Sequence, residues 1–117
     1  MILIVEDEPS LRTIYRSALE RAGFAVRTVD NGADALTDIE REPPDLIVLD
    51  LGLPQMRGEA VIRALASRQV DIPIVVVTGD AFVPALPVTR ILRKPFYLRE
   101  LVTSVEAGVR RPALPSR

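Results

Sequence analysis

The 117-residue sequence predicts a single α/β domain built on an open parallel sheet with helices on both faces. Two observations predict this class. Short apolar runs of strand length alternate about five times with segments of helical period, and several of these runs are continuous, which is typical of strands covered on both faces. We therefore expect right-handed strand-helix-strand crossovers, one domain over residues 1–110 and a short tail over residues 111–117.

The predicted strands are the apolar runs themselves. They cover residues 2–5, 24–29, 46–49, 74–77 and 88–92. None approaches the roughly 20 apolar residues that a membrane-spanning helix requires, so we expect no membrane insertion.

The predicted helices lie between these runs. In the first, apolar residues recur on one helix face between Pro9, which suits an opening turn, and Gly23, which suits a helix end. The same spacing predicts helices that contain residues 35–39, 61–66 and 98–109.

The crossover between the fourth and fifth strands departs from this alternation. Its sequence, "GDAFVPALP", contains Pro84 and Pro87, each of which interrupts a helix, and it is shorter than a usual strand-helix-strand connection. We predict at most one helical turn there, around residues 81–85, so the fourth helix is shortened or absent.

The composition excludes several kinds of chemistry. The chain has no cysteine and no leader-like segment before its first strand, which favours a cytoplasmic protein without disulfides. It has no histidine, so it cannot carry phosphohistidine or run a Ser-His or Cys-His relay. Fifteen basic and sixteen acidic side chains with few aromatic residues argue against nucleic acid as a direct partner.

Polar residues follow the predicted strands at the ends where ligands collect in open parallel sheets. Glu6 and Asp7 follow the first strand, Asp50 the third, Thr78 the fourth and Lys94 the fifth. If the first and third strands are neighbours, three carboxylates crowd one pocket beside a hydroxyl and an ammonium group.

Such a cluster predicts a cation and phosphoryl chemistry. Neighbouring carboxylates repel one another, and all-oxygen ligands suit a hard ion such as Mg²⁺, or Mn²⁺ in its place. A carboxylate can also attack a phosphoryl group to form an acyl phosphate. The cation and Lys94 would neutralise the charge on the transferred oxygens, and Thr78 would donate a hydrogen bond to them.

Four segments in order carry a family resemblance over essentially the whole chain. "ILIVEDEP", "DLIVLDLGLP", "IPIVVVTGDA" and "ILRKPF" resemble the receiver domain of two-component response regulators. The resemblance implies a flavodoxin-like (βα)5 fold with strand order 2-1-3-4-5. It also implies a phosphoprotein that takes a phosphoryl group from a sensor histidine kinase or a histidine phosphotransfer protein, in a two-component or phosphorelay pathway.

The resemblance also implies a role for each site residue. Asp50 is the phosphoacceptor, Glu6 and Asp7 are the acidic pair, with Asp7 favoured for direct metal contact, and the backbone carbonyl of Gly52 completes the metal site. Thr78 and Lys94 hold the phosphoryl oxygens. Beyond its own phosphoryl transfer and dephosphorylation, no enzyme activity is expected. A downstream protein target is possible, and the oligomeric state is left open.

Two further positions concern signalling and local geometry. Thr78 and Ile91 occupy the switch positions that the resemblance implies. Ile91 stands where the family usually has an aromatic that changes rotamer on phosphorylation, and isoleucine cannot make that movement, so we do not expect signalling through the usual switch face. Pro95 makes the Lys94–Pro95 bond a candidate for a cis peptide, since the cis form costs only about 0.5–1 kcal/mol more than the trans form before proline. Asp80 is expected to be a surface or capping acid.

Three alternatives to this hypothesis each predict a different sequence feature. A receiver-shaped interaction module that is never phosphorylated would have lost a site residue, and none is missing. A phosphatase with an Asp nucleophile would have a second acid two residues after Asp50, where Gly52 stands. A flavin carrier would have a hydroxyl- and glycine-rich loop after the first strand, where the sequence is the acidic "EDEPS".

Overall fold

The computed structural model describes residues 1–110, and the predicted tail lies outside the described residues. Five parallel strands form one sheet in the order β2-β1-β3-β4-β5, which confirms the predicted fold. The strands are β1 (Ile2–Val5), β2 (Val26–Val29), β3 (Leu46–Asp50), β4 (Ile74–Thr78) and β5 (Arg90–Arg93). The helices are α1 (Pro9–Arg21), α2 (Gly32–Arg41), α3 (Gly58–Ser67) and α4 (Leu98–Val109). None of these helices is long and apolar enough to span a membrane.

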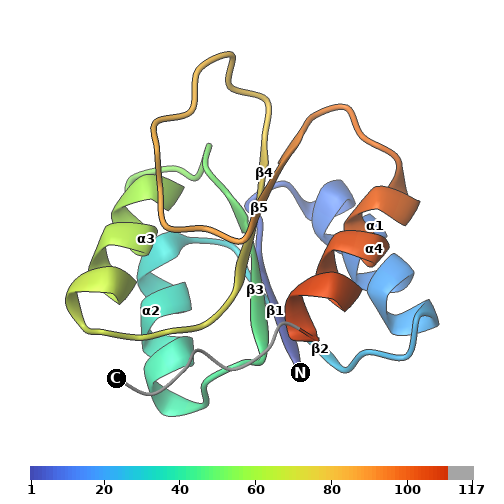
Figure 1. The fold of residues 1–117 in the computed structure, drawn as a ribbon, viewed down its shortest axis with the longest axis horizontal. Helices are drawn as coiled ribbons and strands as arrows, with labels where there is room; N and C mark the ends of the chain where they lie inside the picture. The colour runs from blue at the N-terminus through green and yellow to red at the C-terminus, as the bar shows by residue number, and fades with distance from the viewer. Residues whose placement is uncertain (111–117) are drawn as a thin grey trace.

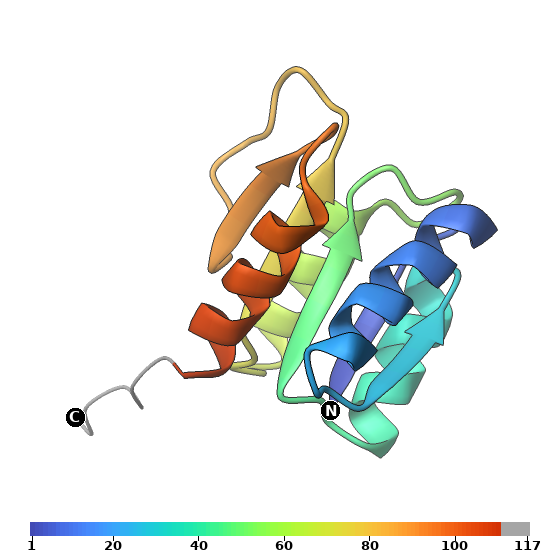
Figure 2. The ribbon, with the colours of Figure 1, turned by 90° about the vertical axis from the view of Figure 1, so that its right-hand side faces the viewer.

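The sheet is the middle of three layers. Helices α2 and α3 cover one face, and α1 and α4 cover the other (Figures 1 and 2). Along β1, Leu3 and Val5 belong to the core on the α2–α3 side, whereas Ile2 and Ile4 belong to the core on the α1–α4 side. Both faces of the strand are buried, which explains why its sequence is apolar without alternation.

Local sequence sets the ends of α1. The carboxylate of Glu8 accepts hydrogen bonds from the backbone N–H groups of Ser10 and Leu11, at 3.2 and 2.9 Å, and Pro9 opens the helix. At the other end Gly23 has a φ of +98°, a conformation that glycine adopts without strain. The first loop of the site is therefore held by a capped helix.

Two strands begin two residues later than predicted, because the preceding residues make turn contacts. The N–H of Phe24 donates to the carbonyl of Leu19 at the end of α1, so β2 begins at Val26. The N–H of Val88 donates to the carbonyl of Leu86, so β5 begins at Arg90. Phe24 and Val88 still pack against the core, which is why both look like strand residues in the sequence.

The crossover between β4 and β5, residues 79–89, contains no helix, which confirms its predicted loss. It extends beyond the carboxyl ends of the strands and returns along the α2–α3 face (Figure 1). Val83, Leu86 and Val88 are half-buried against the core there, while Phe82 is 79% exposed. Isolated apolar side chains thus replace a helix over this part of the sheet.

Candidate functional site

The predicted site residues meet at the carboxyl edge of the sheet. Glu6 and Asp7 follow β1, Asp50 ends β3, Thr78 ends β4 and Lys94 follows β5. Glu6 and Thr78 are each 1% exposed and Asp50 is 6% exposed, whereas Asp7 is open to solvent. The strand order places β1 beside β3 and β3 beside β4, and this brings the residues together from distant parts of the sequence.

The three carboxyl groups form one cluster. Glu6, Asp7 and Asp50 each offer an oxygen, and these oxygens lie within 4.8 Å of one another. Two carboxylates at about 4 Å repel by several kcal/mol at the effective dielectric of a protein surface, so a hard cation among them would be stabilising. The N–H of Gly52 donates to Asp50 Oδ1 at 2.9 Å, so the backbone of residue 52 lies at the same cluster. The metal role of its carbonyl stays a prediction.

Lys94 supplies the positive charge of the cluster. Its Nζ lies 3.1 Å from Asp50 Oδ2 and 3.4 Å from Glu6 Oε1. Burial lowers the pKa of Lys94, but hydrogen bonding and attraction to Asp50 outweigh it and raise the pKa above 10.5. The backbone N–H of Lys94 donates to the carbonyl of Thr78 at 2.7 Å, and the Lys94–Pro95 peptide bond is cis. The ammonium group is therefore charged at neutral pH and directed at the carboxylate of Asp50.

Glu6 is the most perturbed acid of the cluster. Burial and the nearby charge of Asp50 raise its pKa from 4.5 to about 7, against the lowering effect of the Glu8 N–H and of Lys94. Its Oε2 accepts a hydrogen bond from the Glu8 N–H at 3.2 Å. The shift therefore reflects a carboxyl group that is buried beside a second acid and only partly compensated by Lys94.

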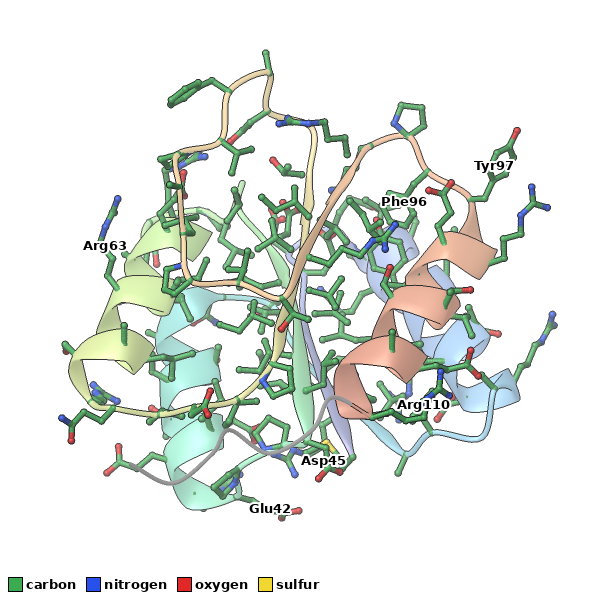
Figure 3. The ribbon with its side chains drawn as sticks, in the orientation of Figure 1. Glu42, Asp45, Arg63, Phe96, Tyr97 and Arg110 are labelled. Atoms are coloured by element: carbon green, nitrogen blue, oxygen red, sulfur yellow. The ribbon has the colours of Figure 1, made fainter. Side chains whose placement is uncertain are left out.

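Phe96 anchors the turn after Lys94. Its ring stacks on that of Tyr15 in α1 with centroids 5.8 Å apart, and Figure 3 shows Phe96 pointing toward α1 while Tyr97 points into solvent. Burial is the main cause that raises the pKa of Tyr15 to about 12. The stack fixes the turn that follows Lys94 to helix α1.

Ile91, the predicted switch position, is half-buried in the middle of β5. It pairs with Val76 in the β4–β5 ladder and packs against the core on the α2–α3 side. An aliphatic side chain in this place has no ring to exchange between buried and exposed rotamers. We therefore treat Ile91 as a residue that packs against the core and not as a rotamer switch.

Sequence reasoning missed three residues that hold the site. Arg12 of α1 donates to the carbonyls of Glu6 and Asp7, at 2.9 and 3.3 Å. Asp80 is the surface acid that the sequence predicts, with a side chain 38% exposed, but its contacts were missed. Its N–H donates to Thr78 Oγ1 at 3.0 Å, and its carboxylate pairs with Arg57 at 2.7 Å. Arg57 and Asp80 lie 23 residues apart on two loops, so no sequence spacing predicts their contact. Arg12 lies one helical turn beyond Glu8, and this position could have predicted that it reaches the first loop of the site.

Comparison with known proteins identifies the family. The sequence model of one protein family, the response regulator receiver domain, matches residues 2–106. The response regulator receiver protein CpdR of Brucella abortus is 36% identical over 111 residues, which cover 90% of this chain and 92% of CpdR. The alkaline phosphatase synthesis transcriptional regulatory protein PhoP of Bacillus subtilis is 38% identical over 116 residues, which cover 94% of this chain but 48% of PhoP.

Solved structures agree with the sequence comparison. The chemotaxis protein CheY4 of Vibrio cholerae superposes with a TM-score of 0.81 at 28% identity, over 92% of this chain and 96% of CheY4. The chain thus matches nearly the full length of some relatives and about half of others. With this sheet order and this cluster of acids, the chain belongs to the response regulator receiver domains of two-component systems.

Proposed function

We propose that this chain accepts a phosphoryl group onto Asp50 from a phosphohistidine on a sensor kinase or a histidine phosphotransfer protein. The observation that supports this most strongly is the placement of Asp50. It is nearly buried, lies beside two further acids, and has Lys94 at 3.1 Å from one carboxylate oxygen. A carboxylate held against a fixed ammonium group is suited to nucleophilic attack on a phosphoryl group.

The reaction exchanges one bond at phosphorus for another. A carboxylate oxygen of Asp50 forms a bond to phosphorus, the P–N bond to the donor imidazole breaks, and the product is an acyl phosphate. Lys94 is already in hydrogen-bonding range of Asp50 and would shift to a phosphoryl oxygen. Thr78 Oγ1 accepts the Asp80 N–H, which leaves its own proton available to donate to a second phosphoryl oxygen.

The donor set fits Mg²⁺. Glu6, Asp7 and Asp50 offer oxygen atoms close enough to share one ion, and Asp7 is the exposed member. Mg²⁺ held there would offset the negative charge of the three carboxylates and of the phosphoryl oxygens. Asp7 is the residue we favour for direct contact, with Glu6 supporting it from the buried side.

A labelling assay tests the proposal. The wild type and Asp50→Asn are incubated with Mg²⁺ and a small phosphodonor such as acetyl phosphate, and acid-labile phosphate is measured. Asp45→Asn is the matched control, because Asp45 is exposed at the opposite edge of the sheet, just before β3 (Figure 3). We expect labelling of the wild type and of Asp45→Asn only. Equal labelling of Asp50→Asn would reject the assignment, and no labelling of any chain would favour an unphosphorylated interaction module.

The groove between α1 and the start of α4 is where we propose that the donor protein docks. It has a volume of about 530 Å³, adjoins Lys94, and has mostly apolar walls. Ile14 and Leu98 on its rim are 44% and 40% exposed. An amphipathic helix of the donor would bury these side chains while presenting its phosphohistidine to Asp50.

Charge introduced on the groove should separate docking from chemistry. Ile14→Glu should slow transfer from a phosphorylated histidine phosphotransfer protein that labels the wild type, and leave labelling by acetyl phosphate unchanged. Thr13→Glu, on an exposed residue outside the groove, is the control. Slowing by both variants, or by neither, would contradict docking at this groove. The chain is otherwise proposed to act as a cytoplasmic signalling domain, with no enzyme activity beyond its own phosphorylation and dephosphorylation.

A further inference from the structure

Asp80 is anchored at three points, although no helix follows β4. Its N–H donates to Thr78 Oγ1 at 3.0 Å, its carbonyl accepts from Arg93 Nη1 at 2.9 Å, and its Oδ2 accepts from Arg57 Nη2 at 2.7 Å. In a crossover with a helix, carbonyls near the helix start accept from N–H groups one turn later, whereas the first N–H groups need a side-chain cap. Here Arg93 bonds the Asp80 carbonyl, Thr78 Oγ1 accepts the N–H, and Arg57 holds the carboxylate.

Arg57 is the member of this set that comes from another crossover. It precedes α3, and Glu59 holds its guanidinium group from the other side at 3.2 and 3.4 Å. Arg57 and Asp80 therefore join the loop that follows Asp50 to the loop that follows Thr78. The side chains are 51% and 38% exposed, so the pair is accessible to solvent and salt.

The ion pair reaches the reacting group through one hydrogen bond. The Asp80 N–H occupies a lone pair of Thr78 Oγ1 and thereby restricts the hydroxyl rotation that aims its proton. Thr78 is 1% exposed, so water has little access to replace this donor. Freeing the Asp80 carboxylate from Arg57 would loosen Asp80 and, with it, the orientation of the hydroxyl.

We propose that Arg57 and Asp80 are positioning residues for the Thr78 hydroxyl, and that their ion pair holds the start of the crossover in place where no helix follows β4. The proposal rests on the proposed phosphorylation of Asp50, because it is in that reaction that Thr78 acts. Neither Arg57 nor Asp80 is proposed to contact the phosphoryl group. Both act on the rate through the geometry of Thr78.

A double-mutant cycle tests whether Arg57 acts through Thr78. Rates of labelling by acetyl phosphate and of loss of the label are measured, with Mg²⁺, for wild type, Arg57→Gln, Thr78→Ala and the double variant. We expect Arg57→Gln to slow both steps about two- to fivefold, the size of effect that an exposed ion pair can supply. In the Thr78→Ala background Arg57→Gln should change neither rate, because the hydroxyl that it positions is gone.

Two controls keep the outcomes distinct. Arg63→Gln changes an exposed arginine of α3, which Figure 3 shows directed into solvent, and should leave both rates unchanged. Asp80→Asn keeps the backbone N–H but removes the charge, so it should reproduce Arg57→Gln. Equal effects of Arg57→Gln with and without the Thr78 hydroxyl, or no effect at all, would overturn the proposal. Failure of the wild type itself to be labelled at Asp50 would instead overturn the proposed function.

Discussion

The crossovers on the two sides of β4 both cover the same face of the sheet, but they do so with different structures. The β3–β4 crossover carries α3, whose Val61, Ile62 and Leu65 are buried against the sheet. The β4–β5 crossover has no helix and covers its part of the sheet with half-buried apolar side chains. Yet β5 keeps its register with β4 from Val75–Arg90 to Thr78–Arg93, and Lys94 reaches Asp50.

This difference shows that the site depends on the strands more than on the helices between them. Lys94 is placed by the end of β5 and by its N–H bond to the Thr78 carbonyl, neither of which needs a helix in the crossover. What a helix would add is buried area and a second rigid surface. Matched substitutions in the two crossovers test whether the helix supplies mainly buried area.

Truncation of one leucine in each crossover should have unequal cost. Leu65→Ala empties a site that is 3% exposed, and should lower the free energy of unfolding by about 3 kcal/mol, since the cavity cannot collapse fully. Leu86→Ala removes a half-buried side chain and should cost about 1 kcal/mol. Urea denaturation measures both. Equal losses would mean that the crossover without a helix is packed as tightly as α3.

A methyl group added to a glycine should also have a different effect on stability in each of the two crossovers. A Cβ on Gly58 would lie 2.6 Å from the carbonyl oxygen of Asp50 and 2.8 Å from Leu51 Cα, both of them backbone atoms. Gly58→Ala should therefore cost about 2 kcal/mol by overpacking, and should displace the end of β3 that carries Asp50. Gly79→Ala, with no atom within 4 Å of its Cβ, should be neutral or slightly stabilising. Thermal unfolding of the two variants checks the contrast, which a tolerated Gly58→Ala would contradict.

The pH dependence of stability should measure the effect of Lys94, which the crossover without a helix leads into, on the pKa of Glu6. In metal-free buffer the raised pKa of Glu6 means that the folded state holds its proton more tightly than the unfolded chain. The contribution of Glu6 is thus complete below about pH 4.5 and is lost as the pH rises through about 7, by on the order of 3 kcal/mol. Lys94→Met should enlarge this loss, because Lys94 lowers the pKa of Glu6.

Denaturation at several pH values with a chelator present makes the measurement. Glu6→Gln is the reference, because it removes the titrating group and should abolish this part of the dependence. The difference between wild type and Glu6→Gln therefore isolates the one carboxyl group. A wild type whose stability rose from pH 5 to 7 relative to Glu6→Gln would show that the pKa is not raised.

Patterns that repeat along the chain were enough to predict the fold. Continuous apolar runs mark strands buried on both faces, and the two prolines of the crossover indicate the missing helix. Strand starts were less exact, because Phe24 and Val88 are apolar residues that contribute to the core from turns. Burial alone does not distinguish a strand residue from a turn residue that packs beside it.

The acids of the site could be predicted because each one stands directly after an apolar run. Asp50 and Glu6 needed only the rule that parallel strands end at one edge. The Arg57–Asp80 pair could not be predicted, since it depends on how two irregular loops approach each other. Arg63, six residues after Arg57, points into solvent. Residue type alone therefore gave no reason to choose Arg57 as the partner of Asp80.

Phe82 should show the smallest effect of all, despite its size. At 79% exposure on the outer part of the crossover it buries little apolar area, so Phe82→Ser should change the free energy of unfolding by less than about 0.5 kcal/mol. Val83→Ser, next to it but half-buried against the core, should cost about 1 kcal/mol. Labelling of Asp50 should be unchanged in both, since neither residue touches Thr78 or Lys94. A larger loss from Phe82→Ser than from Val83→Ser, measured by urea denaturation, would mean that the phenylalanine and not the valine covers the sheet where the helix is missing.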